Sequence, residues 1–222
     1  MVEISTSILS VEEKDCMKTF YDLETAKTDL FHIDVMDGKF VENDTSKKML
    51  EYASNIKQMS NLPLDVHLMV EDAKSYIQEY LPLEPAYITV HKETFKTEEE
   101  LKETIKYIKE YGVKAGVSIK PNTKVEEIYN ILPYIHLVLV MTVEPGKGGQ
   151  SLIETTISKI EELKHYRQEH DLDFYIEADG GINEQTVSLV KEAGVDIIVA
   201  GTAIIQADDY KKAIQALKKE SN

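Results

Sequence analysis

The sequence predicts one α/β domain, a single (β/α)8 TIM barrel that spans residues 1–222. Apolar strand-like runs alternate with helical patterns along the whole chain, and such alternation is typical of a parallel sheet. Eight strand–helix units follow one another, and this number favours closure of the sheet into a barrel. The length of 222 residues also falls within the range of a single α/β barrel.

The predicted strands are short runs rich in Val, Ile and Leu, bounded by turn residues. The run at 136–141 is apolar on both faces, as expected for a strand that is buried on both sides. In several other runs polar residues recur at every second position, which places them on one face of the strand. The eight strands are expected at residues 4–9, 30–35, 63–69, 86–91, 114–119, 136–141, 174–178 and 196–200.

A helical pattern follows each strand, and capping residues mark several helix ends. Ser10 with Glu13, and Thr97 with Glu100, each match a capping box. Gly194 stands in the usual C-cap position of the seventh helix. The eight helices are expected at residues 10–26, 45–56, 73–80, 97–111, 123–132, 153–169, 184–193 and 208–218.

The alternative architecture is an open, doubly wound sheet. Candidate polar residues end seven of the eight predicted strands, whereas an open sheet would gather them at one switch point. This distribution favours the closed barrel. No linker or low-complexity segment indicates a domain boundary.

Composition excludes several classes of partner. The formal net charge is -15 and the sequence pI is about 4.8, which disfavours nucleic acid and anionic membranes. Cys16 is the only cysteine, so there is no internal disulfide, and a reducing compartment is indicated. We see no signal peptide or membrane span and expect a cytoplasmic protein.

Four residues at predicted strand ends form a candidate metal site: His32, Asp34, His67 and Asp179. A barrel brings strand ends together around its axis, so distant residues can meet there. Two imidazoles and two carboxylates suit one divalent ion, either Zn²⁺, Fe²⁺, Mn²⁺ or Co²⁺. Taken singly, each residue is more often a satisfied core histidine or a turn cap. Their joint occurrence in one barrel favours the metal.

Glycines follow the last three predicted strands, where barrels often bind phosphate. Their backbone N–H groups can approach an anion closely, which would let an acidic protein bind a small phosphate. A single glycine pair is usually only a turn, but three such loops in succession favour an anion site. The residues are Gly146, Gly148 and Gly149, then Gly180 and Gly181, then Gly201 with Thr202.

Asp34 and Asp179 come from the second and seventh strands and can face each other across the barrel mouth. If one removes a proton from a C–H next to a polarised carbonyl and the other returns a proton to the opposite face, a stereocentre is inverted. No organic cofactor is needed. Met36, Met69 and Met141 would give this space a soft, water-poor lining, although ordinary core filling is the alternative.

Seven motifs resemble the ribulose-phosphate 3-epimerase family, in the expected order over nearly the whole chain. They are Ser-Ile-Leu-Ser at 7–10, His-Ile-Asp-Val-Met-Asp-Gly at 32–38, Leu-Asp-Val-His-Leu-Met at 64–69, Val-Met-Thr-Val-Glu-Pro-Gly at 140–146, Gly-Gly-Gln at 148–150, Asp-Gly-Gly-Ile-Asn at 179–183 and Ala-Gly-Thr-Ala-Ile at 200–204.

The resemblance implies a barrel of the ribulose-phosphate-binding type that interconverts D-ribulose 5-phosphate and D-xylulose 5-phosphate through a metal-bound ene-diolate. It implies His32, Asp34, His67 and Asp179 as metal ligands, with the two aspartates as the acid/base pair. Ser7 and His67 would contact the substrate. The glycines and Thr202 would bind phosphate, and the three methionines would line the intermediate. Family members suggest homodimers or hexamers.

Four positions depart from the family pattern: Thr6, Glu42, Lys120 and Lys147. Lys147 replaces an aromatic residue in the loop after the sixth strand. These changes leave open an epimerase for a related ketose phosphate, such as D-allulose 6-phosphate. A non-catalytic sugar-phosphate-binding barrel is a third alternative. A related barrel decarboxylase is disfavoured, because its Asp-x-Lys-x-x-Asp pattern needs Lys where Met36 stands.

Overall fold

The fold of the protein was analysed in a computed structural model, which describes residues 2–219. Within this range eight parallel strands close into a barrel in chain order, and the last strand pairs with the first. The predicted (β/α)8 architecture is therefore confirmed. The strands are β1 (Glu3–Ser7), β2 (Leu30–Met36), β3 (Leu64–Met69), β4 (Tyr87–His91), β5 (Lys114–Ile119), β6 (Leu137–Met141), β7 (Tyr175–Asp179) and β8 (Ile197–Ala200).

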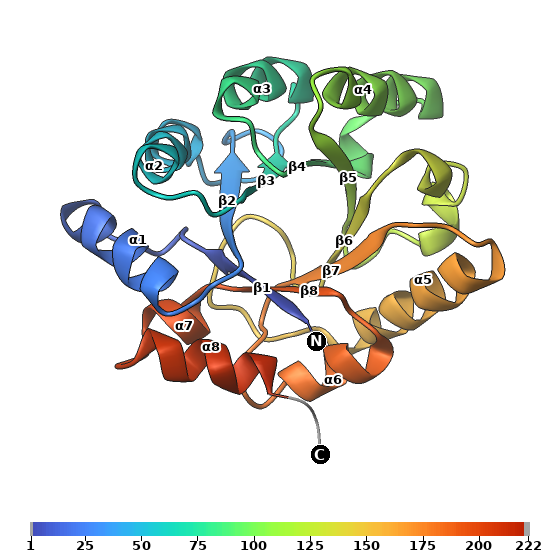
Figure 1. The fold of residues 1–222 in the computed structure, drawn as a ribbon. Coiled ribbons are helices and arrows are strands. Elements are labelled where there is room, and N and C mark those ends of the chain that lie inside the picture. Colours follow the sequence, from blue (N-terminus) through green and yellow to red (C-terminus); the bar gives the residue numbers. More distant parts are fainter. Residues whose placement is uncertain (1, 220–222) are drawn as a thin grey trace.

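The helices form a ring around the barrel, as Figure 1 shows in a view along the barrel axis. They are α1 (Cys16–Thr25), α2 (Ser46–Met59), α3 (Ala73–Tyr80), α4 (Glu98–Glu110), α5 (Ile157–Glu169), α6 (Val187–Ala193), α7 (Thr202–Ile205) and α8 (Tyr210–Lys218). Short 3-10 turns occur at Glu13–Asp15, Leu81–Leu83, Lys92–Thr94, Val125–Ile128, Leu132–Tyr134 and Glu154–Thr156. In the described part of the chain, no helix has the length and apolar character that a membrane crossing requires.

The hydrophobic core lies mainly between the strands and the helix ring. Outward-facing strand residues such as Ile33 and Val66 pack there with helix residues such as Tyr52 and Ile77, all of them buried. This layer holds the barrel in shape, because burial of apolar surface is the dominant favourable term in folding. Because this outer layer supplies most of the apolar packing, the barrel interior can hold polar side chains.

The barrel interior is polar over much of its circumference. Inward-facing positions of β6 and β8 are apolar, with Leu137, Leu139 and Ile197 in one small cluster. Inward-facing positions of the other strands carry buried polar groups, which are Ser5, Ser7, His32, Asp34, Asp65, His67, Thr89, His91, Ser118 and Glu177. Burial of a polar group costs free energy unless the group is paired. These side chains therefore indicate a binding or catalytic site inside the barrel rather than a packed core.

The predicted capping box at Ser10 is wrong. A 3-10 turn at Glu13–Asp15 precedes α1, and the residue before that turn, Glu12, makes no side-chain cap. Tertiary contacts hold the segment instead. The side chain of Val11 is buried, and its carbonyl accepts hydrogen bonds from Lys48 Nζ and Tyr52 Oη of α2.

The predicted helix at 123–132 is also wrong, since this stretch contains the 3-10 turn Val125–Ile128 and the first residue of a second 3-10 turn, but no α-helix. Lys159 Nζ of α5 donates hydrogen bonds to the carbonyls of Lys120 and Thr123, which fixes this chain as a loop. Pro133 lies in the next 3-10 turn, and proline cannot continue an α-helix. Seven longer α-helices and the short α7 therefore accompany the eight strands of the described chain.

Two other predicted helix ends are confirmed. Thr97 accepts a hydrogen bond from the backbone of Glu100 and caps α4. The Glu100 side chain accepts one from the backbone of Lys96 rather than of Thr97, so the box is not reciprocal. Gly194 ends α6 in the left-handed conformation.

Candidate active site

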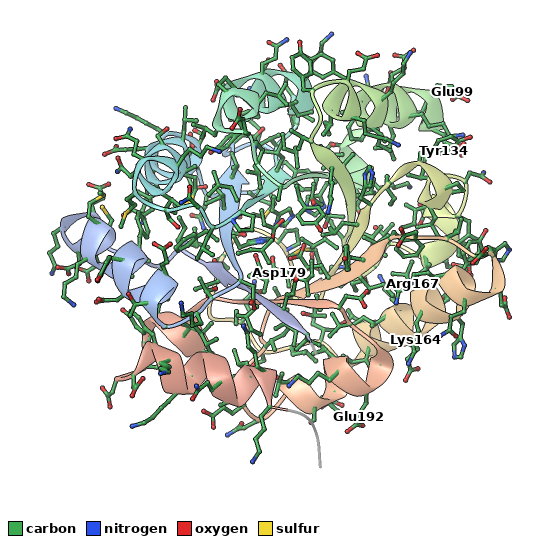
Figure 2. All side chains as sticks on the ribbon, in the orientation of Figure 1. Glu99, Tyr134, Lys164, Arg167, Asp179 and Glu192 are labelled. Atoms are coloured by element: carbon green, nitrogen blue, oxygen red, sulfur yellow. The ribbon has the colours of Figure 1, made fainter. Side chains whose placement is uncertain are left out.

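The strand register brings four predicted residues to one point at the carboxyl end of the barrel. Asp34 of β2 lies beside His67 of β3, and Asp179 is the last residue of β7. One ligand atom from each of His32, Asp34, His67 and Asp179 lies within 4.8 Å of the others. Figure 2 shows Asp179 at the centre of the barrel, whereas the other labelled side chains lie outside it, on α4, α5, α6 and the 3-10 turn Leu132–Tyr134.

Both histidines present one ring nitrogen to both carboxylates. His32 Nε2 lies 3.4 Å from Asp34 Oδ1 and 3.9 Å from Asp179 Oδ2. His67 Nδ1 lies 3.6 Å from Asp34 Oδ1 and 3.7 Å from Asp179 Oδ2. These separations are longer than hydrogen bonds, so the four groups surround a common point without bonding directly to each other.

His32 Nε2 and His67 Nδ1 have no hydrogen-bond partner within residues 2–219, although both atoms are buried. An unpartnered buried polar atom is costly, and here two of them face the same point together with two carboxylates. Nitrogen and oxygen donors in this arrangement suit a divalent cation. The residues therefore form a cluster that could hold a metal ion.

Neighbouring polar groups hold His32 and Asp34 in place. The other nitrogen of His32, Nδ1, lies 2.6 Å from Asp65 Oδ2, and this oxygen also accepts a hydrogen bond from Ser5 Oγ at 2.7 Å. Ser7 Oγ donates to Asp34 Oδ2 at 2.6 Å. Such partners fix the orientation of ligand side chains.

The two carboxyl groups differ in pKa. Burial acts to raise the pKa of Asp34, but the His32 and His67 rings hold it well below its usual range. Burial and the charge of Asp34 raise the pKa of Asp179 to about 6. Environments that push the pKa values of two carboxyls apart are characteristic of acid/base pairs.

A further carboxyl group, that of Glu177, lies below the cluster inside the barrel. It is fully buried, and neither of its oxygens has a hydrogen-bond partner in the described chain. Burial and the charge of Asp65 raise the pKa of Glu177 well above its usual value. The uncharged form of this side chain is therefore favoured next to Asp65.

A cavity of about 700 Å³ opens above the cluster. His32 and His67 lie under it with no exposed surface. Every other residue predicted for the site lines the cavity, namely Ser7, Asp34, Met36, Met69, Met141, Gly146, Gly148, Gly149, Asp179, Gly180, Gly181, Gly201 and Thr202. The structure thus brings both parts of the predicted site into one cavity. These parts are the four candidate metal ligands and the glycine-containing loops.

The glycine pair after β7 is required by the backbone. Gly180 and Gly181 have φ angles of +123° and +69°, values that favour glycine. A Cβ atom on Gly180 would lie 2.2 Å from Val143 Cγ2, and one on Gly181 would lie 2.3 Å from the backbone nitrogen of Leu152. The loop after β7 can therefore pack against the loop after β6 only with glycine at both positions.

The four departures from the family pattern occupy different environments. Lys147 is exposed and lines the cavity. Glu42 is exposed but does not line it. The Lys120 ammonium lies 3.9 Å from the centroid of the Phe40 ring, and Thr6 is buried against Thr28. Only one of the four changes thus alters the wall of the cavity.

No role was predicted from the sequence for three residues that support the cluster: Asp65, which contacts His32, His91, which contacts His67, and Glu93, which contacts His91. Asp65 lies two positions before His67, and His91 lies two positions after Thr89, so each pair shares one face of its strand. This spacing is the sequence signal that could have identified Asp65 and His91. Glu93 follows the end of β4 and has no such pattern.

A protein-family model described as the ribulose-phosphate 3 epimerase family matches residues 3–205. The ribulose-phosphate 3-epimerase of Bacillus subtilis is 41% identical over 98% of this chain and 99% of its own length. That of Methanocaldococcus jannaschii is 38% identical over 99% of this chain and 91% of its own length. The chloroplastic ribulose-5-phosphate-3-epimerase of Arabidopsis thaliana is 37% identical over 97% of this chain and 75% of its own length.

Solved structures with similar folds are more distant in sequence. KGPDC from Streptococcus mutans matches with a TM-score of 0.73 at 13% identity, covering 98% of this chain and 96% of that one. A 3-hexulose-6-phosphate synthase matches with a TM-score of 0.72 at 13% identity, covering 98% of both chains. At this identity the similarity shows the barrel fold alone.

Proposed function

The chain belongs to the ribulose-phosphate 3-epimerase family, an isomerase family that acts on carbohydrates, and we propose that it interconverts D-ribulose 5-phosphate and D-xylulose 5-phosphate. The observation that carries this proposal is the pair of carboxyls, Asp34 and Asp179, with opposite pKa shifts at the floor of one cavity. The reaction inverts one carbon, C3 of the sugar, by removing one proton and adding another.

His32, Asp34, His67 and Asp179 would hold one divalent metal, either Zn²⁺, Fe²⁺, Mn²⁺ or Co²⁺. The fit rests on the two unpartnered ring nitrogens that face the two carboxylates. When bound, the metal would act as a Lewis acid on the carbonyl and hydroxyl oxygens of the sugar and so acidify the C3 proton.

Asp34 and Asp179 would exchange the protons. Ionised Asp34 is suited to accept the C3 proton on one side of the sugar, while Asp179, whose raised pKa lets it take up a proton more readily, is suited to return one on the other side. The reverse reaction exchanges the two roles, and each cycle leaves one proton on the pair. Ser7 Oγ, which donates to Asp34 Oδ2, holds that carboxylate in position and would contact the substrate.

Met36, Met69 and Met141 line the cavity and would exclude water from the planar intermediate. The phosphate would bind at the far end, on backbone N–H groups of the loops after β6, β7 and β8. The glycines of these loops let the backbone approach closely, and Thr202 would add a hydroxyl. The exposed Lys147 at the same wall would supply a positive charge to a protein that is otherwise strongly acidic.

A six-carbon ketose phosphate such as D-allulose 6-phosphate is the alternative substrate. Of the departures that motivate it, Lys120 and Glu42 do not line the cavity. The space available to the sugar therefore differs from the family pattern only at Lys147, and the five-carbon substrate is favoured. The metal cluster and its two carboxyls disfavour a non-catalytic binding barrel.

The test is an assay of the purified protein with each sugar phosphate and one divalent metal at a time. We expect D-xylulose 5-phosphate to form from D-ribulose 5-phosphate, with one solvent deuterium incorporated at C3 in D₂O. The catalytic efficiency should be higher on the five-carbon than on the six-carbon substrate. Absence of both inversion and deuterium uptake would contradict the proposed function.

A further inference from the structure

His67 is connected, through the neighbouring ring of His91, to a carboxylate that lies outside the candidate metal site. His67 Nε2 lies 2.9 Å from His91 Nε2, and His91 Nδ1 lies 3.1 Å from Glu93 Oε2. Both rings are fully buried, and the Glu93 side chain is 18% exposed. The chain of contacts therefore runs from the cluster through β4 to the loop that follows it.

Glu93 is itself fixed at its other oxygen. Oε1 accepts a hydrogen bond from the backbone N–H of Lys120 at 2.7 Å and one from the hydroxyl of Thr123. Burial acts to raise the pKa of Glu93, but its hydrogen bonds and the His91 ring lower it to about 2. The group is therefore a carboxylate, which can only accept hydrogen bonds.

The direction of every hydrogen bond in the chain follows from this carboxylate. Because Glu93 only accepts, His91 Nδ1 carries the proton. A neutral imidazole has one N–H, so His91 Nε2 is an acceptor and His67 Nε2 donates to it. His67 Nδ1 is then left with a free lone pair, and this is the atom that faces Asp34 and Asp179.

We propose that Glu93 and His91 are positioning residues that fix the tautomer of His67, so that its Nδ1 lone pair always points at the metal. The proposal rests on the metal binding proposed above. His32 offers a parallel, because Asp65 accepts from its Nδ1 and leaves Nε2 for the cluster. One histidine is held by a carboxylate directly, and the other through a second imidazole.

Glu93→Gln is the decisive variant, because its amide has nearly the shape of the carboxylate. The backbone N–H of Lys120 requires an acceptor, so the amide oxygen takes the place of Oε1. The NH₂ group then faces His91 Nδ1 and donates to it. His91 Nε2 must carry the proton and donate to His67, and His67 Nδ1 receives a proton that points into the metal site.

The first measurement is a long-range ¹H–¹⁵N correlation spectrum of metal-free protein labelled at histidine. We expect His67 to be protonated at Nε2 in the parent and at Nδ1 in Glu93→Gln. The second is a competition titration of Zn²⁺ or Co²⁺ against a chromophoric chelator. The variant should bind the metal about 10–100-fold more weakly, the usual effect of losing an outer partner of a metal ligand.

Thr123→Val is the matched control, since it removes one hydrogen bond from the same carboxylate but keeps its charge. It should retain the parent tautomer and bind metal within about threefold of the parent, because a neutral hydrogen bond contributes little net free energy. It also shows whether disturbance of this loop alone weakens the site.

An unchanged His67 tautomer together with unchanged metal affinity in Glu93→Gln would overturn the proposal, as would equal losses of affinity in Thr123→Val. A parent protein that bound neither ion would instead contradict the proposed metal. Even then the spectra of the metal-free parent and Glu93→Gln would decide whether Glu93 sets the tautomer.

Discussion

The Asp34 and Asp179 carboxyls differ in pKa because their surroundings differ. Asp34 accepts a hydrogen bond from Ser7 and faces two imidazoles, and its side chain is 7% exposed. The side chain of Asp179 accepts no hydrogen bond within residues 2–219, and burial together with the charge of Asp34 disfavours its ionised form. In the proposed reaction the same residue type would therefore serve as a base at one position and as an acid at the other.

Replacement of either aspartate by asparagine should strongly reduce the rate of epimerisation. We expect kcat to fall by about 10²–10⁴-fold in Asp34→Asn and in Asp179→Asn, since this is the usual contribution of acid/base catalysis. Turnover and C3 deuterium uptake should be measured with the bound metal quantified in each variant. Asp44→Asn, at an exposed residue bonded to Ser46, is the control and should keep parental activity.

Lys147 should assist binding rather than chemistry. We expect Lys147→Ala to raise KM for the sugar phosphate by up to about fivefold, the effect of one exposed ion pair, and to leave kcat unchanged. The increase should shrink at high salt because exposed charges are screened. Initial rates at two salt concentrations test this, with Glu42→Gln as the control. An unchanged KM would show that Lys147 does not contact the phosphate.

Glu93 should make the stability of the fold depend on pH. Its folded-state pKa of about 2 lies below the ordinary value of 4.5, so its contribution is present above about pH 4.5 and is lost as the pH falls toward 2. The contribution is on the order of 1–3 kcal/mol. Urea unfolding across this range should show a smaller loss of stability in Glu93→Gln than in the parent.

Other carboxyls titrate in the same range, so the comparison needs a second variant. Glu99→Gln, on an exposed position of α4, should lose stability in parallel with the parent as the pH falls. A parallel loss in Glu93→Gln as well would mean that Glu93 does not contribute.

At the scale of elements, the loops that follow β6 and β7 form the wall of the cavity together. Asn43 from the loop after β2 also reaches this wall, donating a hydrogen bond from Nδ2 to the carbonyl of Gly146 at 2.7 Å. The end of the cavity that is proposed to bind phosphate is therefore assembled from segments that are far apart in the sequence. Its geometry depends on the contact between Gly181 and Leu152.

Gly181→Ala should disturb this wall more than its backbone angle alone explains. Gly181 and Gly112 have similar φ angles of +69° and +77°, but a Cβ atom would meet Leu152 only at Gly181, and nothing lies within 4 Å at Gly112. We expect Gly112→Ala to cost about 1 kcal/mol of unfolding free energy and Gly181→Ala about 1–3 kcal/mol more. Equal losses in urea unfolding would contradict the steric argument.

At the scale of the whole molecule, the proposed metal would join β2, β3 and β7. A ligand that binds only the folded state stabilises it by about 2.7 kcal/mol at a hundredfold excess over Kd. For a chain of 222 residues this corresponds to a rise in Tm of roughly 5–10 °C. Calorimetry with Zn²⁺ or Co²⁺, and with a chelator, measures it.

Asp34→Asn removes one proposed ligand and serves as the control for that experiment. Its Tm should respond much less to the metal than that of the parent. If both proteins shifted equally, the ion would be binding elsewhere on the acidic surface.

The sequence by itself determined the barrel and the members of the cluster. Strict alternation of strands and helices predicts the parallel barrel, and period-two spacing places His32 with Asp34 and Asp65 with His67 on one strand face. Both signals are local, because side chains alternate across any strand. Sequence was less successful at the helix start near Ser10 and with the helix predicted at 123–132. There, contacts of Val11 with α2 and of Lys159 with the loop after β5 override local capping and propensity.

Only the tertiary structure decided which atoms meet. The contacts of His32 with Asp65 and of His67 with His91 depend on the register between neighbouring strands, which no pattern within one strand specifies. Glu93 reaches His91 because Lys120 and Thr123, from the next loop, hold its carboxylate in place. Hydrogen-bond direction and pKa depend on the positions of groups distant in sequence, so the tautomer of His67 and the contrast between Asp34 and Asp179 emerge only in the closed barrel.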